Sequence, residues 1–267
     1  MSAEVWGVLT VCLYAAAAIA VAARQCARCP GGWQVWVLYL IARVYSPLMF
    51  GQRIRAKCPF PREGPALVIA NHRSPVDPMF IFSGSQEKLG GRFIRVVEFM
   101  TAREYCEVKG PIGWICRNMR CIPVDRNGKD MGPAKEALRR LQAGHLVGIF
   151  PEGRLNLDPP EKGLLPGNPG VAWLALRSEA PVLPVYIHDA PLGTSMVAPF
   201  LRRSYTQVTF GEPIDLSKYY GMKPTPALLA EVTDILMERL AALGHLKARK
   251  CETVQPANGV ARLAETG

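Results

Sequence analysis

Length, composition and charge set the first limits on this chain. It has 267 residues, 49% of them hydrophobic, with eight cysteines and a formal net charge of +10. This size allows one large domain or two small ones with a packed core. The cysteines follow no disulfide framework, and the CxxC pair Cys26 and Cys29 lacks the second pair that a zinc site needs. We therefore expect reduced thiols and no metal site.

The N-terminal segment is apolar. Residues 5–23 hold no charged side chain, and as a helix they would extend roughly 28 Å, close to the thickness of the hydrocarbon core of a bilayer. Because residues 1–4 lack the basic region of a signal peptide, a retained membrane anchor is the favoured interpretation. A cleaved signal peptide and a buried helix are the alternatives.

Positive charge gathers after this segment. Between Val5 and Arg62 the chain has no acidic residue, and its basic residues there are Arg24, Arg28, Arg43, Arg53, Arg55, Lys57 and Arg62. This pattern favours an anionic membrane surface as the partner. Nucleic acid is the competing interpretation of the charge. No other segment resembles a nucleic-acid-binding motif, so we expect no nucleic-acid partner.

A second apolar segment covers residues 33–50. Arg43 and Pro47 interrupt it, and its tryptophans and tyrosines are residues that favour the headgroup region. We expect one spanning anchor followed by an interfacial helix, or a helical hairpin that dips into one leaflet. Both arrangements keep the basic clusters on the cytoplasmic side of the membrane.

The rest of the chain alternates apolar runs with helical patterns. Strands are expected at 66–70, 92–97, 146–150, 182–187 and 205–210, with a short apolar strand before Arg126. Helices are expected at 133–143, at 171–178, and from Thr225 to Gly244.

This alternation predicts an α/β fold with a mixed, mostly parallel central sheet flanked by helices, preceded by an N-terminal membrane-associated helical segment. Three regions are expected: a membrane anchor with an interfacial helix at 1–57, an α/β domain at 58–246, and a disordered tail at 247–267.

The first polar motif is Asn71-His72-Arg73-Ser74-Pro75-Val76-Asp77, directly after an expected strand. Either Ser74 caps a helix that begins at Pro75, or Asp77 is the cap. Both registers could bring the Asp77 carboxylate to the His72 imidazole. A carboxylate on one ring nitrogen fixes the tautomer and leaves the other nitrogen free to accept a proton. An isolated His-x4-Asp pattern is more often an incidental surface histidine beside a cap.

The second motif, Phe150-Pro151-Glu152-Gly153-Arg154, follows another expected strand. Gly153 permits a tight turn and a close approach of a ligand to the backbone. Arg154 can bind a phosphate through two parallel hydrogen bonds. Glu152 is expected to orient an arginine or to accept a hydrogen bond from a substrate hydroxyl. Alone, this motif would be only a polar turn after a strand.

Further cations lie between the two motifs. Arg126 follows an apolar strand much as Arg154 does, so the two could clamp one anion. Arg103 and Lys109 are weaker candidates, each more often a solvated charge.

Four sequence blocks, in this order, resemble the glycerolipid acyltransferases. They are Asn71-His72-x-Ser74-x-x-Asp77, Pro111-x-Gly113 followed by Val124-Asp125-Arg126, Phe150–Arg154, and Ala180–Ile187. The resemblance covers roughly residues 35–245 and is nearest to the bacterial 1-acyl-sn-glycerol-3-phosphate acyltransferase (PlsC) type.

The resemblance implies a role for each block. His72 would be the general base and Asp77 its orienting partner. The phosphate and glycerol of the acceptor would bind Arg126, Glu152, Gly153 and Arg154, with Arg103 near the basic residue expected before the Pro-x-Gly block. The fourth block would bind the acyl donor or pack in the core.

The resemblance also implies the reaction. A fatty acyl group would pass from acyl-CoA or acyl-carrier protein to the hydroxyl of lysophosphatidic acid, giving phosphatidic acid at the cytoplasmic face of the inner membrane. No covalent acyl-enzyme and no cofactor besides the donor are expected, and backbone amides near the first motif would stabilise the oxyanion. Glycerol 3-phosphate, another lysophospholipid or a lyso-aminolipid are the alternative acceptors.

Two other classes of function compete with acyl transfer. A serine esterase or lipase would need a Gly-x-Ser-x-Gly elbow, which does not occur in the sequence. A non-catalytic membrane adaptor would explain the basic N-terminal region but neither polar motif.

Overall fold

The centre of the molecule is one seven-stranded sheet. A computed structural model describes residues 2–85, 94–125 and 130–249. The strand order is β1-β7-β6-β2-β5-β3-β4, with β1 (Arg53–Ile54), β2 (Ala66–Ala70), β3 (Val97–Ala102), β4 (Ile122–Val124), β5 (Leu146–Ile149), β6 (Val182–His188) and β7 (Gln207–Phe210). Among these seven strands, β6 and β7 pair antiparallel and the other neighbours pair parallel. The predicted mixed, mostly parallel sheet is confirmed.

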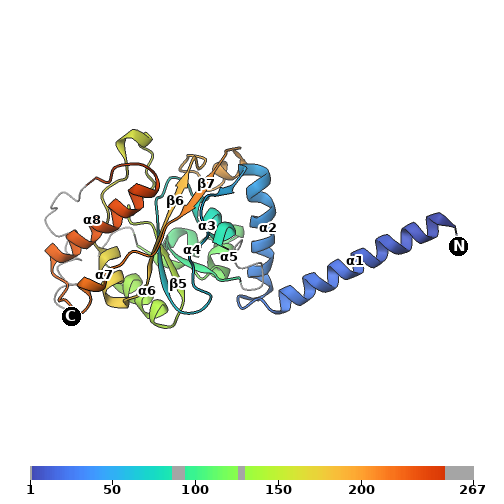
Figure 1. Ribbon diagram of the computed structural model, residues 1–267, viewed down its shortest axis with the longest axis horizontal. Helices are drawn as coiled ribbons and strands as arrows, with labels where there is room; N and C mark the ends of the chain where they lie inside the picture. The colour runs from blue at the N-terminus through green and yellow to red at the C-terminus, as the bar shows by residue number, and fades with distance from the viewer. Residues whose placement is uncertain (1, 86–93, 126–129, 250–267) are drawn as a thin grey trace.

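Helices cover both faces of the sheet (Figure 1). Their bounds are α1 (Ala3–Ala27), α2 (Gly32–Phe50), α3 (Asp77–Ser85), α4 (Arg103–Glu107), α5 (Pro111–Asn118), α6 (Gly132–Gln142), α7 (Gly170–Ser178) and α8 (Pro226–Leu243), with short 3₁₀ turns η1 (Pro160–Lys162), η2 (Ala198–Leu201) and η3 (Ser217–Tyr219).

Alternate residues of β2 contribute to two separate apolar cores. Leu67 and Ile69 pack in a core built with α6, α7 and α8. Ala66, Val68 and Ala70 pack on the other face, with residues of α3 and the C-terminal end of α2. Because every residue of β2 is buried, the strand appears in the sequence as an uninterrupted apolar run.

Helix α1 is apolar throughout and stands apart from the domain. None of its residues is buried, and its mean hydropathy reaches 2.2 over an 18-residue window, so it is long and apolar enough to cross a membrane. Figure 1 shows α1 projecting away from the domain. The alternative of a buried helix is therefore wrong.

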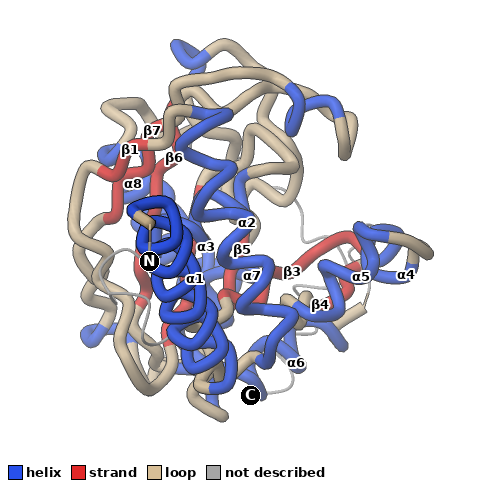
Figure 2. Tube along the Cα trace, turned by 90° about the vertical axis from the view of Figure 1, so that its right-hand side faces the viewer, coloured by secondary structure: helices blue, strands red, loops and turns tan. Residues whose placement is uncertain are grey.

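Helix α2 is the second apolar segment, and it continues through Pro47 without a break. Figure 2, seen from the side on which α1 projects, shows α2 lying across this face of the domain. Its buried residues are Val35, Ala42, Ser46 and Phe50. Side chains on its outer surface, among them Val44 and Leu48, are exposed. One face of α2 therefore packs on the domain, and the other is apolar and open.

The strand expected at 92–97 was misplaced. β3 begins only at Val97, and residues 92–93 lie outside the described part of the chain. The cause is Glu98, a buried carboxylate inside the strand that accepts hydrogen bonds from Arg140 and His145. A charged residue breaks the apolar pattern by which buried strands are predicted.

The strand β1, the helices α4 and α5 and the three 3₁₀ turns were not predicted. β1 pairs with β7, so a strand of the sheet lies before the proposed domain boundary at 57–58. At the other boundary, the amide of Leu164 donates to the Lys247 carbonyl at 3.2 Å. Residues 250–267 of the expected tail lie outside the described residues.

The packing of Gly148 gives a test of the core. A Cβ at this position would lie 2.5 Å from the Phe99 ring and 2.8 Å from Val97 Cγ1. Gly148→Ala is expected to lower the free energy of unfolding by about 1–3 kcal/mol, because the strand cannot move away from its neighbours. Denaturant unfolding in detergent would measure the change.

Gly7→Ala is the matched control, since a Cβ there would meet nothing within 4 Å. Equal stability of the Gly148 variant and the wild type would contradict this description of the packing.

Candidate active site

His72 and Asp77 meet just beyond the carboxyl end of β2. Helix α3 begins at Asp77, close to the second of the two predicted cap registers. The Asp77 Oδ2 atom lies 2.9 Å from His72 Nδ1 and accepts hydrogen bonds at 2.8 Å from the amides of Arg73 and Ser74. The Asp77 side chain is fully buried, whereas that of His72 is 20% exposed. The contact expected between carboxylate and imidazole is therefore present.

This arrangement determines which ring nitrogen is open. With Asp77 on Nδ1, the proton of the neutral imidazole is held on Nδ1, so Nε2 carries the lone pair. Within the described residues no partner is recorded for Nε2. The amides of Arg73 and Ser74 already donate to Asp77. They are therefore not available to stabilise an oxyanion.

Two further side chains fix the motif to the strand β6 and the loop after it. The Asn71 amide donates to the Ile187 carbonyl at 2.9 Å and accepts from the Ile187 amide at 2.7 Å. Ser74 Oγ donates to the Pro191 carbonyl at 2.7 Å. Both side chains are buried. The motif therefore has little freedom to move relative to the sheet.

The His72 ring stacks on a phenylalanine of the second motif. Phe150 lies parallel to it, with centroids 3.9 Å apart and planes 13° from parallel. Phe99 of β3 stacks behind Phe150 at 5.2 Å. Together with the Asp77 contact, this stacking fixes both the position and the plane of the imidazole.

Glu152 holds the two motifs together. Its Oε1 accepts from the His72 amide at 3.0 Å, and its Oε2 accepts from the Leu165 amide and from Asn156 Nδ2. Glu152 thus contacts backbone and side-chain amide groups, where we expected an arginine or a substrate hydroxyl. Burial raises the pKa of Glu152 above 4.5, and these three hydrogen bonds oppose the shift.

Asn156 was not singled out in the sequence. Its amide donates to the His72 carbonyl at 2.7 Å, while its side chain donates to Glu152 and to the Gly163 carbonyl. The side chain is buried. An asparagine in a loop carries no periodic signal, so only its contacts identify this positioning role.

Gly153 and Arg154 form the exposed tip of the same turn. Gly153 has a φ of 67°, a conformation that favours glycine. Arg154 is exposed and follows directly on this residue. Its positive charge lowers the pKa of Asp158, although the main cause there is Arg249. The tip therefore offers a cation close to the segment that holds His72.

Of the other two arginines predicted for the acceptor site, only Arg103 falls within the described residues. Arg103 donates to both oxygens of Asp125, at 2.7 and 3.1 Å, and to Glu107 at 3.3 Å. These bonds engage the guanidinium with carboxylates of this chain. Arg126 lies outside the described residues. In the described ranges, no group of three or more His, Cys, Asp or Glu residues is placed to hold a metal ion.

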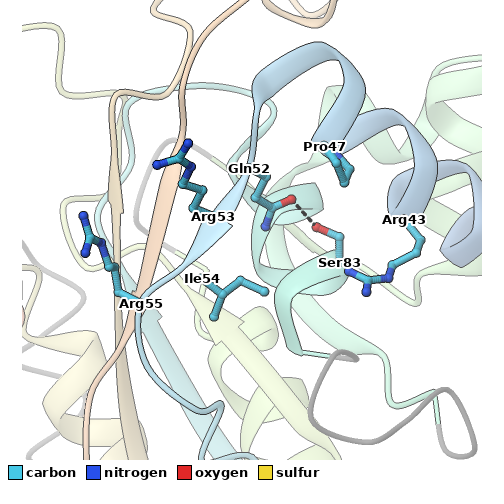
Figure 3. A pocket seen from close by; sticks show the side chains of 7 residues that line it. All are labelled: Arg43, Pro47, Gln52, Arg53, Ile54, Arg55 and Ser83. Carbon is cyan, nitrogen blue, oxygen red and sulfur yellow. Dashed lines mark hydrogen bonds between the residues drawn. The ribbon is translucent and has the colours of Figure 1, made fainter.

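A cavity of about 410 Å³ lies between α2, β1 and α3. Its lining residues are Arg43, Pro47, Gln52, Arg53, Ile54, Arg55 and Ser83. Figure 3 shows Gln52 hydrogen-bonded to Ser83, with Arg53 and Arg55 pointing away from that pair. No lining residue belongs to either polar motif, and the arginines do not converge. This cavity is therefore separate from the two polar motifs.

The buried carboxylate gives a pH-dependent test. The pKa of Glu152 in the folded protein is raised, so binding of a proton to this side chain stabilises the folded state. This stabilisation is fully present below pH 4.5 and is lost as the pH rises through the pKa of the folded state. The free energy of unfolding of the wild type minus that of Glu152→Gln should therefore decline as the pH rises above 4.5. Urea unfolding at several pH values would measure it.

Glu161→Gln, at an exposed position, controls for the change in charge. A difference that grew with rising pH for Glu152→Gln would contradict the effect of burial.

Comparisons with known proteins identify the family and the fold. The acyltransferase family model matches residues 52–188, which is about half of the chain. A 1-acyl-sn-glycerol-3-phosphate acyltransferase of Bacillus subtilis (strain 168) is 27% identical over 148 residues, 55% of this chain and 68% of that protein. The crystal structure of the LPA acyltransferase PlsC from Thermotoga maritima has the same fold, with a TM-score of 0.58 and 18% identity over 81% of this chain and 82% of that one. The protein described here belongs to the acyltransferase family.

Proposed function

We propose that this acyltransferase moves a fatty acyl group from an acyl thioester, acyl-CoA or acyl-carrier protein, to the free hydroxyl of lysophosphatidic acid, giving phosphatidic acid. The observation that carries the proposal is the His72–Asp77 pair, 2.9 Å apart, on a segment whose His72 backbone amide is bonded to Glu152 of the second motif. The name of the Bacillus subtilis relative supports the choice of acceptor.

The reaction needs one base and no covalent intermediate. His72 Nε2 removes the proton of the acceptor hydroxyl while the oxygen attacks the thioester carbonyl carbon. The tetrahedral intermediate collapses with cleavage of the C–S bond, and the leaving thiolate takes up the proton held by the His72 imidazolium, which restores the neutral base. Asp77 stabilises the imidazolium formed in between, because its carboxylate stays on Nδ1. We propose no cofactor besides the acyl donor.

The phosphate of the acceptor is assigned to Arg154. Its exposed guanidinium can form two parallel hydrogen bonds to phosphate oxygens, and Gly153 leaves the backbone open beside it. Arg126 remains proposed as the second cation of this site. Arg103 would have to exchange Asp125 for the phosphate, so we place it behind these two. Glycerol 3-phosphate, other lysophospholipids and lyso-aminolipids are the competing acceptors.

The membrane supplies the acceptor. The apolar helix α1 and the family of the protein suggest membrane association. The exposed apolar face of α2 suits the interface between membrane and water. We propose that the domain lies on the cytoplasmic face of the inner membrane, since the basic residues after α1 would then face anionic lipids.

Replacing His72 tests the base. His72→Ala is expected to lower the rate of acyl transfer by at least about 10²–10⁴-fold, because no other group would take the hydroxyl proton. Labelled acyl-CoA, supplied with and without lysophosphatidic acid, would measure transfer separately from hydrolysis of the donor.

His245→Asn is the control, since asparagine tolerates the φ of 53° at this position. Its transfer rate should match that of the wild type. A robustly active His72→Ala enzyme would refute the assignment.

Replacing Arg154 tests the phosphate site. Arg154→Gln is expected to raise KM for lysophosphatidic acid by about 10–100-fold, the loss expected for a charge-assisted pair of hydrogen bonds. The kcat should change much less. A lipid acceptor without a phosphate should be converted equally by both enzymes, and Arg177→Gln, at another exposed arginine, should behave as the wild type. An unchanged KM would place the phosphate elsewhere.

A further inference from the structure

The loop between β6 and β7, residues 189–206, exposes an unusual amount of apolar surface. Leu192, Val197, Leu201 and Tyr205 are 42%, 57%, 68% and 85% exposed. The loop holds a single short element, the 3₁₀ turn η2, which ends at Leu201. Exposed apolar side chains gathered on one segment indicate a contact with a partner or with a membrane.

The loop is fixed to the C-terminal end of α2. The Tyr45 hydroxyl donates to the Phe200 carbonyl at 2.5 Å, and the Thr206 amide donates to the Phe50 carbonyl at 2.9 Å. Tyr205 lies against Gly51, where an added Cβ would be 3.0 Å from the tyrosine ring. The loop and α2 therefore form one surface.

This surface continues the apolar face of α2. Val44 and Leu48 of α2 are exposed, at 58% and 76%. In Figure 1, the β6–β7 connection lies beside the C-terminal end of α2, and α2 lies across the direction in which α1 projects. If α1 crosses a bilayer, α2 and the loop would lie at the surface of that bilayer.

The charges of the loop fit a lipid surface. Arg202 and Arg203 follow Leu201 directly and are exposed, and the single acidic residue of the loop is Asp189 at its start. Apolar side chains next to arginines, with a tyrosine at the edge, are the residues that contact acyl chains, phosphates and headgroups at an interface.

The other end of the loop contacts the first motif. Ser74 Oγ donates to the Pro191 carbonyl at 2.7 Å, and Ser74 is buried. The same residue supplies one of the two amides that hold Asp77. The loop thus connects the outer face of α2 with the segment that carries His72.

We propose that the β6–β7 loop is a second bilayer-contacting element, which inserts Val197 and Leu201 below the phosphates of an anionic leaflet and thereby holds the His72 motif at a fixed height above the lipid. The consequence for a lipid acceptor, that it reaches His72 from the bilayer, rests on the proposed function. The contact with the bilayer itself does not.

A crosslinking experiment tests this contact directly. The full chain, with photoreactive benzoylphenylalanine in place of Leu201, is reconstituted in vesicles of phosphatidylcholine and phosphatidylglycerol and irradiated. Adducts with lipid are expected, and mass spectrometry would identify them. The same group in place of Met222, an exposed residue beside the C-terminal end of α7, is the matched control and should give at most about one tenth as much lipid adduct.

Three results would overturn the proposal. The first is equal lipid labelling at the two positions. The second is labelling of acyl-carrier protein, when it is present, in place of lipid, which would make the loop a protein-docking surface. The third is a yield of lipid adduct at position 201 that stays the same when phosphatidylglycerol is left out of the vesicles, both with Arg203 in place and in the Arg203→Gln variant. None of these readouts requires acyl transfer, so a failure of the proposed function would be seen separately.

Activity gives an independent readout. Leu201→Glu is expected to raise KM for lysophosphatidic acid in vesicles by about tenfold, because a carboxylate cannot replace leucine among acyl chains. KM for a short-chain, water-soluble acceptor should stay unchanged, and thermal unfolding would confirm that the variant is folded. An equal effect on both acceptors would show that the loop acts on the site and not through the bilayer.

Discussion

One carboxylate oxygen organises the first polar motif. Asp77 Oδ2 accepts from two backbone amides and faces His72 Nδ1, so one buried charge holds the turn, the start of α3 and the imidazole together. Two amide donors offset the cost of burying this charge, and the histidine provides a third polar contact. A neutral amide at this position could accept hydrogen bonds from the backbone but would carry no negative charge facing the imidazole. The chemistry and the local fold therefore depend on the same atom.

The sheet supplies the second constraint. β2 and β5 are parallel neighbours, so their carboxyl ends lie side by side and bring residues 72 and 152 together from distant parts of the chain. Glu152 then joins the two turns through the His72 amide, while Phe150 stacks on the imidazole. Glu152 therefore serves to position His72, and Arg154 is left as the cation at the exposed tip of the turn.

Much of the fold was predictable where apolar residues in the sequence coincide with the residues that the strands and helices bury. β2, β5 and β6 are uninterrupted apolar runs with helices on both faces, and α8 begins after Thr225, whose side chain accepts from the Leu228 amide. The His72–Asp77 contact was also predictable, because the carboxyl end of a strand and a helix start five residues later leave few geometries. The catalytic roles themselves remain predictions.

Other features could not be read from local pattern. Glu98 obscures β3, because its partners Arg140 and His145 are more than forty residues away in the chain. Asn156 and the Leu165 amide decide the role of Glu152, and both lie in irregular loops. The partner of Arg103, Asp125, likewise lies on another element. In each case the information is in tertiary contacts between polar groups, which no periodicity encodes.

Asn71 shows how the chain leaves the sheet without losing its alignment. Its side-chain amide donates to the Ile187 carbonyl and accepts from the Ile187 amide. Backbone groups would have made these two hydrogen bonds if β2 had continued past Ala70. The backbone is thereby released to turn away while the hydrogen-bond ladder is completed by a side chain. The next residue, His72, is consequently positioned by β6, although it does not belong to that strand. Its place is therefore fixed by the hydrogen bonds of the sheet, even though it lies in a loop.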